Sequence, residues 1–301
     1  MTTTSTPPPS AAPIPTRTDD LILTLSCADR PGLVLDISRL LVDQRGDIVE
    51  SQQFSDRESS RFFMRLRFGP IDETPLDRET LSKGLQALAR HTDMSWRVSA
   101  AVDRPRVLIM VSKYGHCLND LLFRTANGDL PIDVAAVVSN HPDLGVLADN
   151  YLVPFHHVPI ASSGKPAAEA RLLEIVHDLD IDLVVLARYM QILSTELCKR
   201  LEGRAINIHH SMLPSFKGAR PYFQAKDRGV KLVGATAHYV TADLDEGPII
   251  EQEVARVDHT LTAEDVTALG RDNECLALAR AVRWHAENRV LLDGHRTVVF
   301  R

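Results

Sequence analysis

Hydrophobic and polar positions follow two different periods in the first hundred residues of the chain. Segments rich in β-branched and aromatic residues are typical of strands, whereas Leu33, Ile37, Leu40 and Leu41 recur at the spacing of one helical face. The predicted elements are strand 20–27, helix 31–46, strands 47–54 and 60–68, helix 78–91 and strand 95–102.

This order of strand, helix, strand, strand, helix and strand is that of the split ferredoxin-like unit. We therefore predict an α+β domain over residues 19–101. Residues 1–18 are mostly Thr, Pro and Ala without apolar periodicity, which predicts a disordered tail. The tail has neither the positive segment nor the apolar segment of a secretory signal.

The pattern changes after residues 103–107, where we place a domain junction. Short, strongly apolar runs then alternate with helical patterns such as 167–178, which predicts a Rossmann-like α/β domain over residues 104–301 with a mostly parallel sheet. A strand pair, a long helix and a last apolar run follow. The apolar runs are 107–112, 133–139, 156–160, 182–187 and 205–209, and the later elements are 230–240, 248–257, 263–287 and 296–300.

Composition narrows the class of protein. The chain has 301 residues, a formal net charge of -6 and no run of Lys and Arg, so we expect no nucleic-acid partner. No apolar run approaches the roughly 18 residues of a membrane-spanning helix, so we expect no membrane partner. Four scattered cysteines without a C-x-x-C pair argue against a structural zinc site and a disulfide framework, and they favour the reducing cytoplasm.

Candidate chemistry gathers where the run 205–209 ends, because ligands bind beyond the carboxyl ends of strands in open α/β sheets. Side chains alternate along a strand, so Asn207 and His209 share one face about 7 Å apart. An amide can donate to a developing oxyanion, and an imidazole can move a proton. The segment "DLDEGP" follows about 35 residues later and supplies carboxylates, Asp245 among them, that could orient the imidazole.

Simpler explanations compete with this one. A histidine at a strand end is usually structural, and Asp-Glu-Gly-Pro is most often only a turn. A metal site made of His209, His210 and His238 lacks the usual helical spacing, so we predict no metal. A thiol nucleophile at Cys117 beside His116 is also unfavourable, because adjacent side chains point apart; Cys117 is then a packing residue.

Two segments, "NIHHSMLPSFKGARPY" and "GATAHYVTADLDEGPIIEQE", closely resemble the folate-dependent formyltransferase family. The resemblance implies catalytic roles for Asn207, His209 and Asp245. The segment "VVLARYMQIL" resembles the part of that family that lines the pterin pocket. The folate contacts implied by the resemblance are Arg188, Tyr189, Met190, Gln191, Leu193, Thr241, Leu244 and Glu246.

Two further segments indicate which branch of the family the chain resembles. "SKYGHCLNDLL" lacks the Gly-Asn/Ser-rich turn with which glycinamide ribonucleotide transferases hold the substrate phosphate. "CADRPGLVLDISRLLVDQRGDIVESQQF" resembles an ACT domain, a small ligand-sensing module. The combination resembles the formyltetrahydrofolate deformylases.

That resemblance implies hydrolysis of 10-formyltetrahydrofolate to formate and tetrahydrofolate, which supplies formate for purine biosynthesis and balances one-carbon folate pools. It implies no cofactor, because the folate is itself the substrate and water is the acceptor. Formyl transfer to an amine such as glycinamide ribonucleotide, and a non-catalytic sensor, stay open as alternatives.

The ACT resemblance implies an amino-acid effector such as glycine or methionine. Its expected docking turn consists of Asp29, Arg30, Pro31, Gly32 and Leu33. ACT units commonly pair through their sheets, so we also expect a homo-oligomer, either a dimer or a tetramer.

Overall fold

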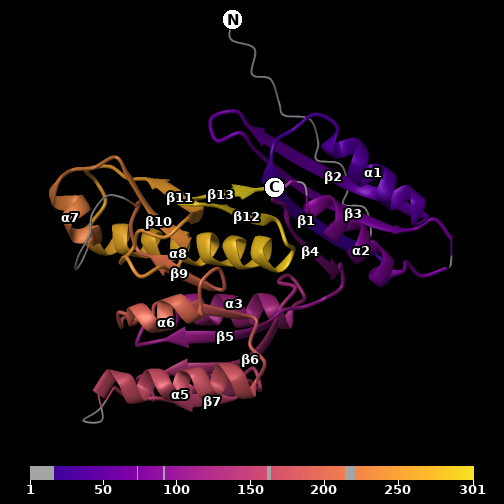
Figure 1. Ribbon diagram of the computed structural model, residues 1–301. Coiled ribbons are helices and arrows are strands. Elements are labelled where there is room, and N and C mark those ends of the chain that lie inside the picture. Colours follow the sequence, from indigo (N-terminus) through magenta and orange to yellow (C-terminus); the bar gives the residue numbers. More distant parts are fainter. Residues whose placement is uncertain (1–16, 73, 91, 161–163, 214–220) are drawn as a thin grey trace, which may run out of the picture. The chain divides into compact units, whose positions relative to one another are not determined.

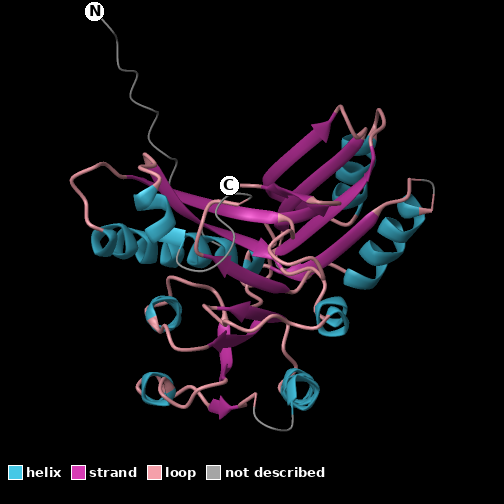
Figure 2. Cartoon of the chain, turned by 90° about the vertical axis from the view of Figure 1, so that its left-hand side faces the viewer, coloured by secondary structure: helices cyan, strands magenta, loops and turns pink. Residues whose placement is uncertain are grey.

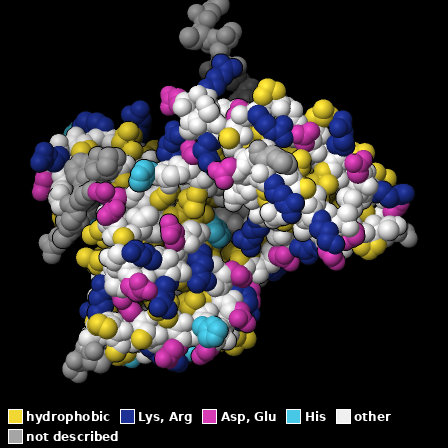
Figure 3. All heavy atoms as spheres, in the orientation of Figure 1, with side chains coloured by type: hydrophobic (Ala, Val, Ile, Leu, Met, Phe, Trp, Pro, Cys, Tyr) yellow, Lys and Arg dark blue, Asp and Glu magenta, His cyan; other side chains and the backbone are white. Residues whose placement is uncertain are grey.

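The computed structural model describes residues 17–301 except 73, 91, 161–163 and 214–220 (Figure 1). The predicted tail therefore lies outside the described residues, apart from its last two. The chain divides into two compact units, Met1–Asp103 and Arg104–Arg301. Acidic and basic side chains are interspersed over the face that Figure 3 draws, in keeping with 34 basic and 40 acidic residues in the chain.

The first unit is an antiparallel sheet with the strand order β2-β3-β1-β4 and two helices. One hydrophobic core joins α1 and α2 to one face of this sheet; Ile37, Leu85 and Phe68 are fully buried in it. The ferredoxin-like order predicted from the sequence is thereby confirmed. The elements are β1 (Leu21–Ala28), α1 (Leu33–Asp43), β2 (Gly46–Asp56), β3 (Arg61–Pro70), α2 (Arg78–Ala89) and β4 (Ser95–Ala100).

Helix α1 is shorter at both ends than the predicted 31–46. It begins after Gly32, whose φ of 88° lies in the left-handed region, and it ends before Arg45, whose φ is 59°. Helix α2 begins where the Asp77 carboxylate accepts hydrogen bonds from the amides of Glu79 and Thr80, a normal N-cap.

The second unit is built on a seven-stranded sheet with the order β11-β10-β9-β8-β5-β6-β7. The five strands from β5 to β9 run parallel, and β10 runs antiparallel to both of its neighbours, β9 and β11, so the prediction of a mostly parallel sheet is confirmed. The strands are β5 (Arg106–Val111), β6 (Asp133–Ser139), β7 (Phe155–His157), β8 (Leu183–Leu186), β9 (Ala205–His209), β10 (Leu232–Tyr239) and β11 (Ile249–Arg256).

Helices cover both faces of this sheet, as the end-on helices in Figure 2 show. One core holds side chains of α3 and α8, and the other holds side chains of α5 and α6. Both faces are therefore apolar, which explains the continuous hydrophobic runs of β5, β6 and β8. The helices are α3 (His116–Ala126), α4 (Gly145–Asp149), α5 (Gly164–Asp178), α6 (Thr195–Arg200), α7 (Pro221–Asp227) and α8 (Ala263–Ala286).

Two local features differ from the sequence-based expectation. Strand β7 covers three residues where the sequence suggested 156–160, and Pro159, which has no amide proton, lies just beyond its end. The last apolar run forms β13 (Arg296–Val299), which pairs with an unpredicted strand, β12 (Val290–Asp293), as a separate hairpin. None of the described helices has the length and apolar composition needed to cross a membrane.

Candidate active site

The order of the large sheet creates a site beside β8 and β9. β5 is the first strand of this sheet along the chain. β6 and β7 lie on one side of β5, and the next strands, β8 and β9, lie on its other side. Ligands bind where the strand order reverses in this way, beyond the carboxyl ends of the strands. A cavity of about 260 Å³ lies there, lined by the segments that follow β8, β9 and β10.

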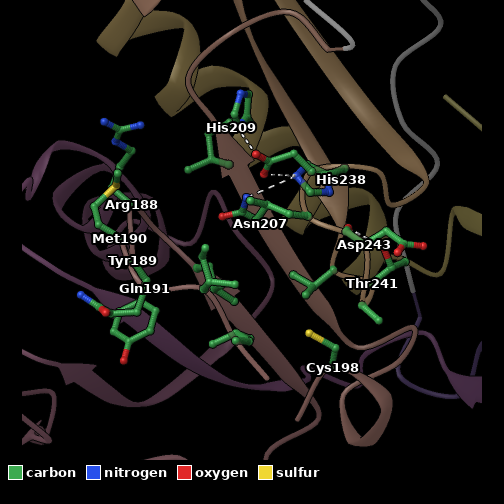
Figure 4. Close-up of a pocket in the computed structure, with 18 of the residues that line it drawn as sticks. Arg188, Tyr189, Met190, Gln191, Cys198, Asn207, His209, His238, Thr241 and Asp243 are labelled. Carbon is green, nitrogen blue, oxygen red and sulfur yellow. Dashed lines mark hydrogen bonds and ion pairs between the residues drawn. The ribbon is translucent and has the colours of Figure 1, made fainter. Parts of the chain in front are cut away.

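The three residues predicted to be catalytic meet at one end of this cavity. His209 Nδ1 lies 3.2 Å from Asp245 Oδ2, and both side chains are largely buried. Asn207 lies on the same strand and lines the same cavity (Figure 4). The other ring nitrogen of His209, Nε2, is buried and has no hydrogen-bond partner among the described residues.

A fourth residue, His238, joins this group and was not predicted to do so. It lies opposite Asn207 in the pairing of β9 with β10. Its Nδ1 lies 2.9 Å from the Tyr239 carbonyl oxygen, which can only accept, so Nδ1 carries the proton. Its Nε2 therefore accepts from the Asn207 amide, 3.2 Å away.

This hydrogen bond fixes the orientation of the Asn207 side chain. The amide nitrogen has two protons, and His238 uses one of them. The second amide proton remains to bond another acceptor in the cavity. His238 Nε2 also lies 3.8 Å from Asp245 Oδ1, so the imidazole contacts both neighbours.

The pKa values of the group fit these assignments. Burial lowers the pKa of His238 against the raising effects of the Tyr239 carbonyl and Asp245, so the ring stays neutral. Burial raises the pKa of Asp245, but the hydrogen bond from His209 and the electrostatic influence of the imidazoles of His209, His238 and His210 outweigh burial and lower it. The net pKa of Asp245 is below its usual value, and the group is a carboxylate at neutral pH.

The loop after β10 brings Asp245 back to the sheet. Asp245 has a φ of 57° in the left-handed region, a conformation that Asp tolerates better than most residues. Two residues later, a Cβ on Gly247 would lie 1.8 Å from the Tyr239 carbonyl oxygen. Only glycine lets the backbone approach so closely, and this approach returns the loop to His238 and His209.

The cavity separates the predicted folate contacts into two groups. Figure 4 shows the segment Arg188 to Gln191 on one side, and Thr241 and Asp243 on the other. Of the predicted contacts, Glu246 alone does not line the cavity. The residues that line it are Leu186, Arg188, Tyr189, Met190, Gln191, Ile192, Leu193, Cys198, Asn207, Ile208, His209, His210, His238, Val240, Thr241, Ala242, Asp243, Leu244 and Asp245.

Comparison with known proteins agrees with this geometry. The formyl transferase family profile matches residues 105–282. A formyltetrahydrofolate deformylase of Corynebacterium sp. (strain P-1) is 52% identical over 280 residues, 93% of this chain and 98% of the relative. A formyltetrahydrofolate deformylase of Bacillus subtilis is 43% identical over 281 residues, 92% of this chain and 93% of the relative.

The chain belongs to the formyltetrahydrofolate deformylase family.

Solved structures support the same assignment. A deformylase of this family from Pseudomonas putida KT2440 superposes with a TM-score of 0.89 at 50% identity, over 93% of this chain and all of the other. A glycinamide ribonucleotide transformylase from Symbiobacterium toebii superposes with a TM-score of 0.63 at 33% identity, over 66% of this chain and 95% of the other. The likeness to deformylases thus extends over nearly the whole chain.

A buried glutamate beside the cavity escaped the sequence analysis. Glu274 of α8 is 1% exposed and accepts hydrogen bonds from His116 Nε2 at 2.7 Å and Tyr222 OH at 2.8 Å. Arg188 Nε lies 3.3 Å from the same carboxylate, and the Arg188 guanidinium lies over the ring of Tyr114. We call Glu274, His116, Arg188 and Tyr222 the Glu274 cluster.

This cluster also bears on the thiol and metal alternatives. His116, Cys117 and Glu274 place ligand atoms within 4.8 Å of one another in the described part of the chain. His116 is engaged with Glu274, and Cys117 is fully buried. A hydrogen bond with Cys275, together with burial, holds the pKa of Cys117 well above its usual value. A thiol in this form is a poor nucleophile and a poor metal ligand.

The predicted effector turn lies in the first unit, between β1 and α1. Asp29, Pro31 and Gly32 are exposed, and Arg30 Nη2 donates to Asp36 Oδ2 at 2.7 Å. Leu33 is 2% exposed and packs in the core, so its side chain is unavailable to a ligand. The docking of an effector at this turn stays a prediction.

The imidazole of His210, the residue after His209, makes the stability of the fold depend on pH. Burial, then the charges of Arg188 and His209, lower the pKa of His210 from 6.5 to about 4. In the pH range between these two values the unfolded chain binds a proton at this position and the folded chain does not. Stability must therefore fall as the pH falls from 6.5 to about 4.

We expect this site to contribute on the order of 2 kcal/mol to that loss, less than the full shift because the ring is partly exposed. Urea unfolding of the chain and of His210→Gln at pH 7 and pH 4.5 measures it. The variant should lose less stability between the two conditions. Equal losses would show that the His210 imidazole does not titrate in this way.

Proposed function

We propose that the chain hydrolyses 10-formyltetrahydrofolate to formate and tetrahydrofolate. The observation that carries the proposal is the group of Asn207, His209 and Asp245 at one end of the cavity. Relatives named formyltetrahydrofolate deformylase, 40–52% identical over more than nine-tenths of the chain, support it.

In the proposed reaction, water attacks the formyl carbon and the carbonyl oxygen becomes an oxyanion. Asn207 donates its second amide proton to that oxygen, since the first is held by His238. His209 Nε2, which is buried and unpartnered among the described residues, takes the proton from water and delivers it to N10 of the folate. The C–N10 bond then breaks to release formate and tetrahydrofolate.

Asp245 is the positioning group in this scheme. Its carboxylate lies against His209 Nδ1, so Nδ1 carries a proton and Nε2 is left to react. The same contact stabilises the imidazolium that forms while His209 holds the proton. The reaction needs no cofactor in this scheme, because the folate is itself the substrate and His209 carries the proton from water to N10.

We place the pterin end of the folate between the segment 188–193 and the segment 241–244. The predicted contacts Tyr189, Met190, Gln191, Leu193, Thr241 and Leu244 all line the cavity there. At about 260 Å³ it is smaller than a typical site of roughly 300–1,000 Å³, so only part of the substrate lies inside it. Arg188 contributes to the wall, with its guanidinium held by Glu274 and Tyr114.

We further propose that the first unit acts as an ACT domain that senses glycine or methionine at the turn 29–33, and that it joins subunits through its strands. We expect the enzyme in the cytoplasm. The cysteines are free thiols, which suits a reducing compartment.

One assay tests the proposed hydrolysis and the proposed effectors. Purified chain is mixed with 10-formyltetrahydrofolate alone, and formate is measured over time. We expect formate to appear without any amine, and at the same rate after exhaustive treatment with a chelator. Formyl transfer that depends strictly on glycinamide ribonucleotide would make the chain a transferase. Added glycine or methionine should change the rate, and no change with either would remove the proposed effectors.

A further inference from the structure

His210 has no role in the mechanism above, although it lies beside the reacting group. It follows β9 directly and lines the same cavity as Asn207 and His209. Its ring centroid lies 5.1 Å from that of His209, with the two planes tilted by 32°. On another side it meets the ring of Tyr222 edge-on, at a centroid distance of 6.4 Å.

The Tyr222 side of this arrangement is firmly held. Tyr222 OH donates to Glu274, which also holds His116 and Arg188. Burial raises the pKa of Glu274. The hydrogen bond from His116, the charges of Arg188 and His116, and the hydrogen bond from Tyr222 outweigh burial and lower the pKa, so the group is an anion. A Cβ on Gly270 would lie 2.1 Å from the Tyr222 ring, so α8 has no side chain where this ring packs.

His210 itself retains its hydrogen-bonding capacity. Among the described residues, neither of its ring nitrogens has a hydrogen-bond partner. Arg188 and the burial of the ring favour the neutral form, which has one N–H donor and one lone-pair acceptor. A neutral imidazole of this kind binds water well, and it leaves the proton transfer to the neighbouring His209.

We propose that His210 holds the attacking water against the formyl carbon. This inference rests on the proposed hydrolysis. The water donates one hydrogen bond to the free ring nitrogen of His210 and gives its other proton to His209 Nε2 as its oxygen bonds to the formyl carbon. The proton leaves on N10, so one water is consumed for each formate. The Glu274 cluster fixes the Tyr222 ring that packs against His210, which keeps the water in register with the reacting atoms.

The test compares His210→Ala, His210→Asn and His210→Gln with the full-length wild type. Formate release and the binding of tetrahydrofolate, the product, are both measured. We expect His210→Ala to lower kcat about a hundredfold, since a misplaced reactant costs roughly that factor, with tetrahydrofolate binding unchanged. The amide side chains of His210→Asn and His210→Gln should recover part of the rate, and added imidazole should raise the rate of His210→Ala. His177→Ala, an exposed histidine on α5, is the matched control and should behave as wild type.

Two results would overturn the inference. One is formate release by His210→Ala within a few-fold of wild type. The other is a slow His210→Ala that neither imidazole nor an amide side chain improves, which would assign His210 to packing. If the wild type itself releases no formate, the proposed function fails first, and this outcome is distinct from both.

Discussion

Replacing His209 with alanine is expected to lower kcat about a thousandfold, because a positioned acid–base group contributes roughly 10²–10⁴. His209 is the one member of the group whose free nitrogen can serve both the water and N10. Asn207→Ala should cost about 10²–10³, the usual value for one oxyanion donor. Asp245→Asn should cost at least a hundredfold, because His209 loses the carboxylate at 3.2 Å that orients it.

Steady-state kinetics on the three variants measures these losses, and tetrahydrofolate binding separates them from misfolding. Binding should stay near the wild-type value in each variant, since the proposed folate walls come from other residues. His177→Ala again serves as the control. Near wild-type turnover in Asp245→Asn would refute the assigned roles.

The second large effect is expected from Gly247→Ala. The added Cβ would lie 1.8 Å from the Tyr239 carbonyl oxygen and 3.3 Å from His238 Nδ1. The first neighbour is backbone and cannot move aside alone, so the loop must shift and Asp245 must leave His209. We expect a loss of about a hundredfold in kcat from this misplacement, and a destabilisation of roughly 2–4 kcal/mol.

Gly145→Ala in α4 is the matched control for this change. Its Cβ would meet Phe155 at 3.4 Å, an ordinary contact, so stability should change by less than about 1 kcal/mol. Thermal unfolding and formate release are measured for both variants. A Gly247→Ala protein with wild-type stability and turnover would show that the close approach to Tyr239 is not needed.

Local patterns were sufficient to predict the order of most elements and part of the site. The alternation of side chains along β9 placed Asn207 and His209 on one face, and the structure brings both to one cavity with Asp245. The resemblance of "DLDEGP" to a family motif identified the carboxylate. These features depend on neighbouring residues or on recognisable segments, which is why the sequence revealed them.

The partners of the site depend on pairing between distant segments, which a single sequence does not specify. His238 reaches Asn207 only through the antiparallel register of β10 with β9. Glu274 meets partners 158 and 52 positions away, and its own stretch of helix resembles any other. The role of His210 likewise emerges only once Tyr222 is placed beside it.

The origin of the oxygen in formate tests the central claim most directly, namely that the Asn207, His209 and Asp245 group hydrolyses the formyl bond with water. The full-length chain is incubated with 10-formyltetrahydrofolate in ¹⁸O-labelled water without an amine, and the product formate is analysed by mass spectrometry. The account predicts one labelled oxygen in each formate from the wild type, and formation of this labelled formate at least a hundredfold more slowly with Asp245→Asn. Unlabelled formate from the wild type, or labelled formate formed by Asp245→Asn at the wild-type rate, would contradict it.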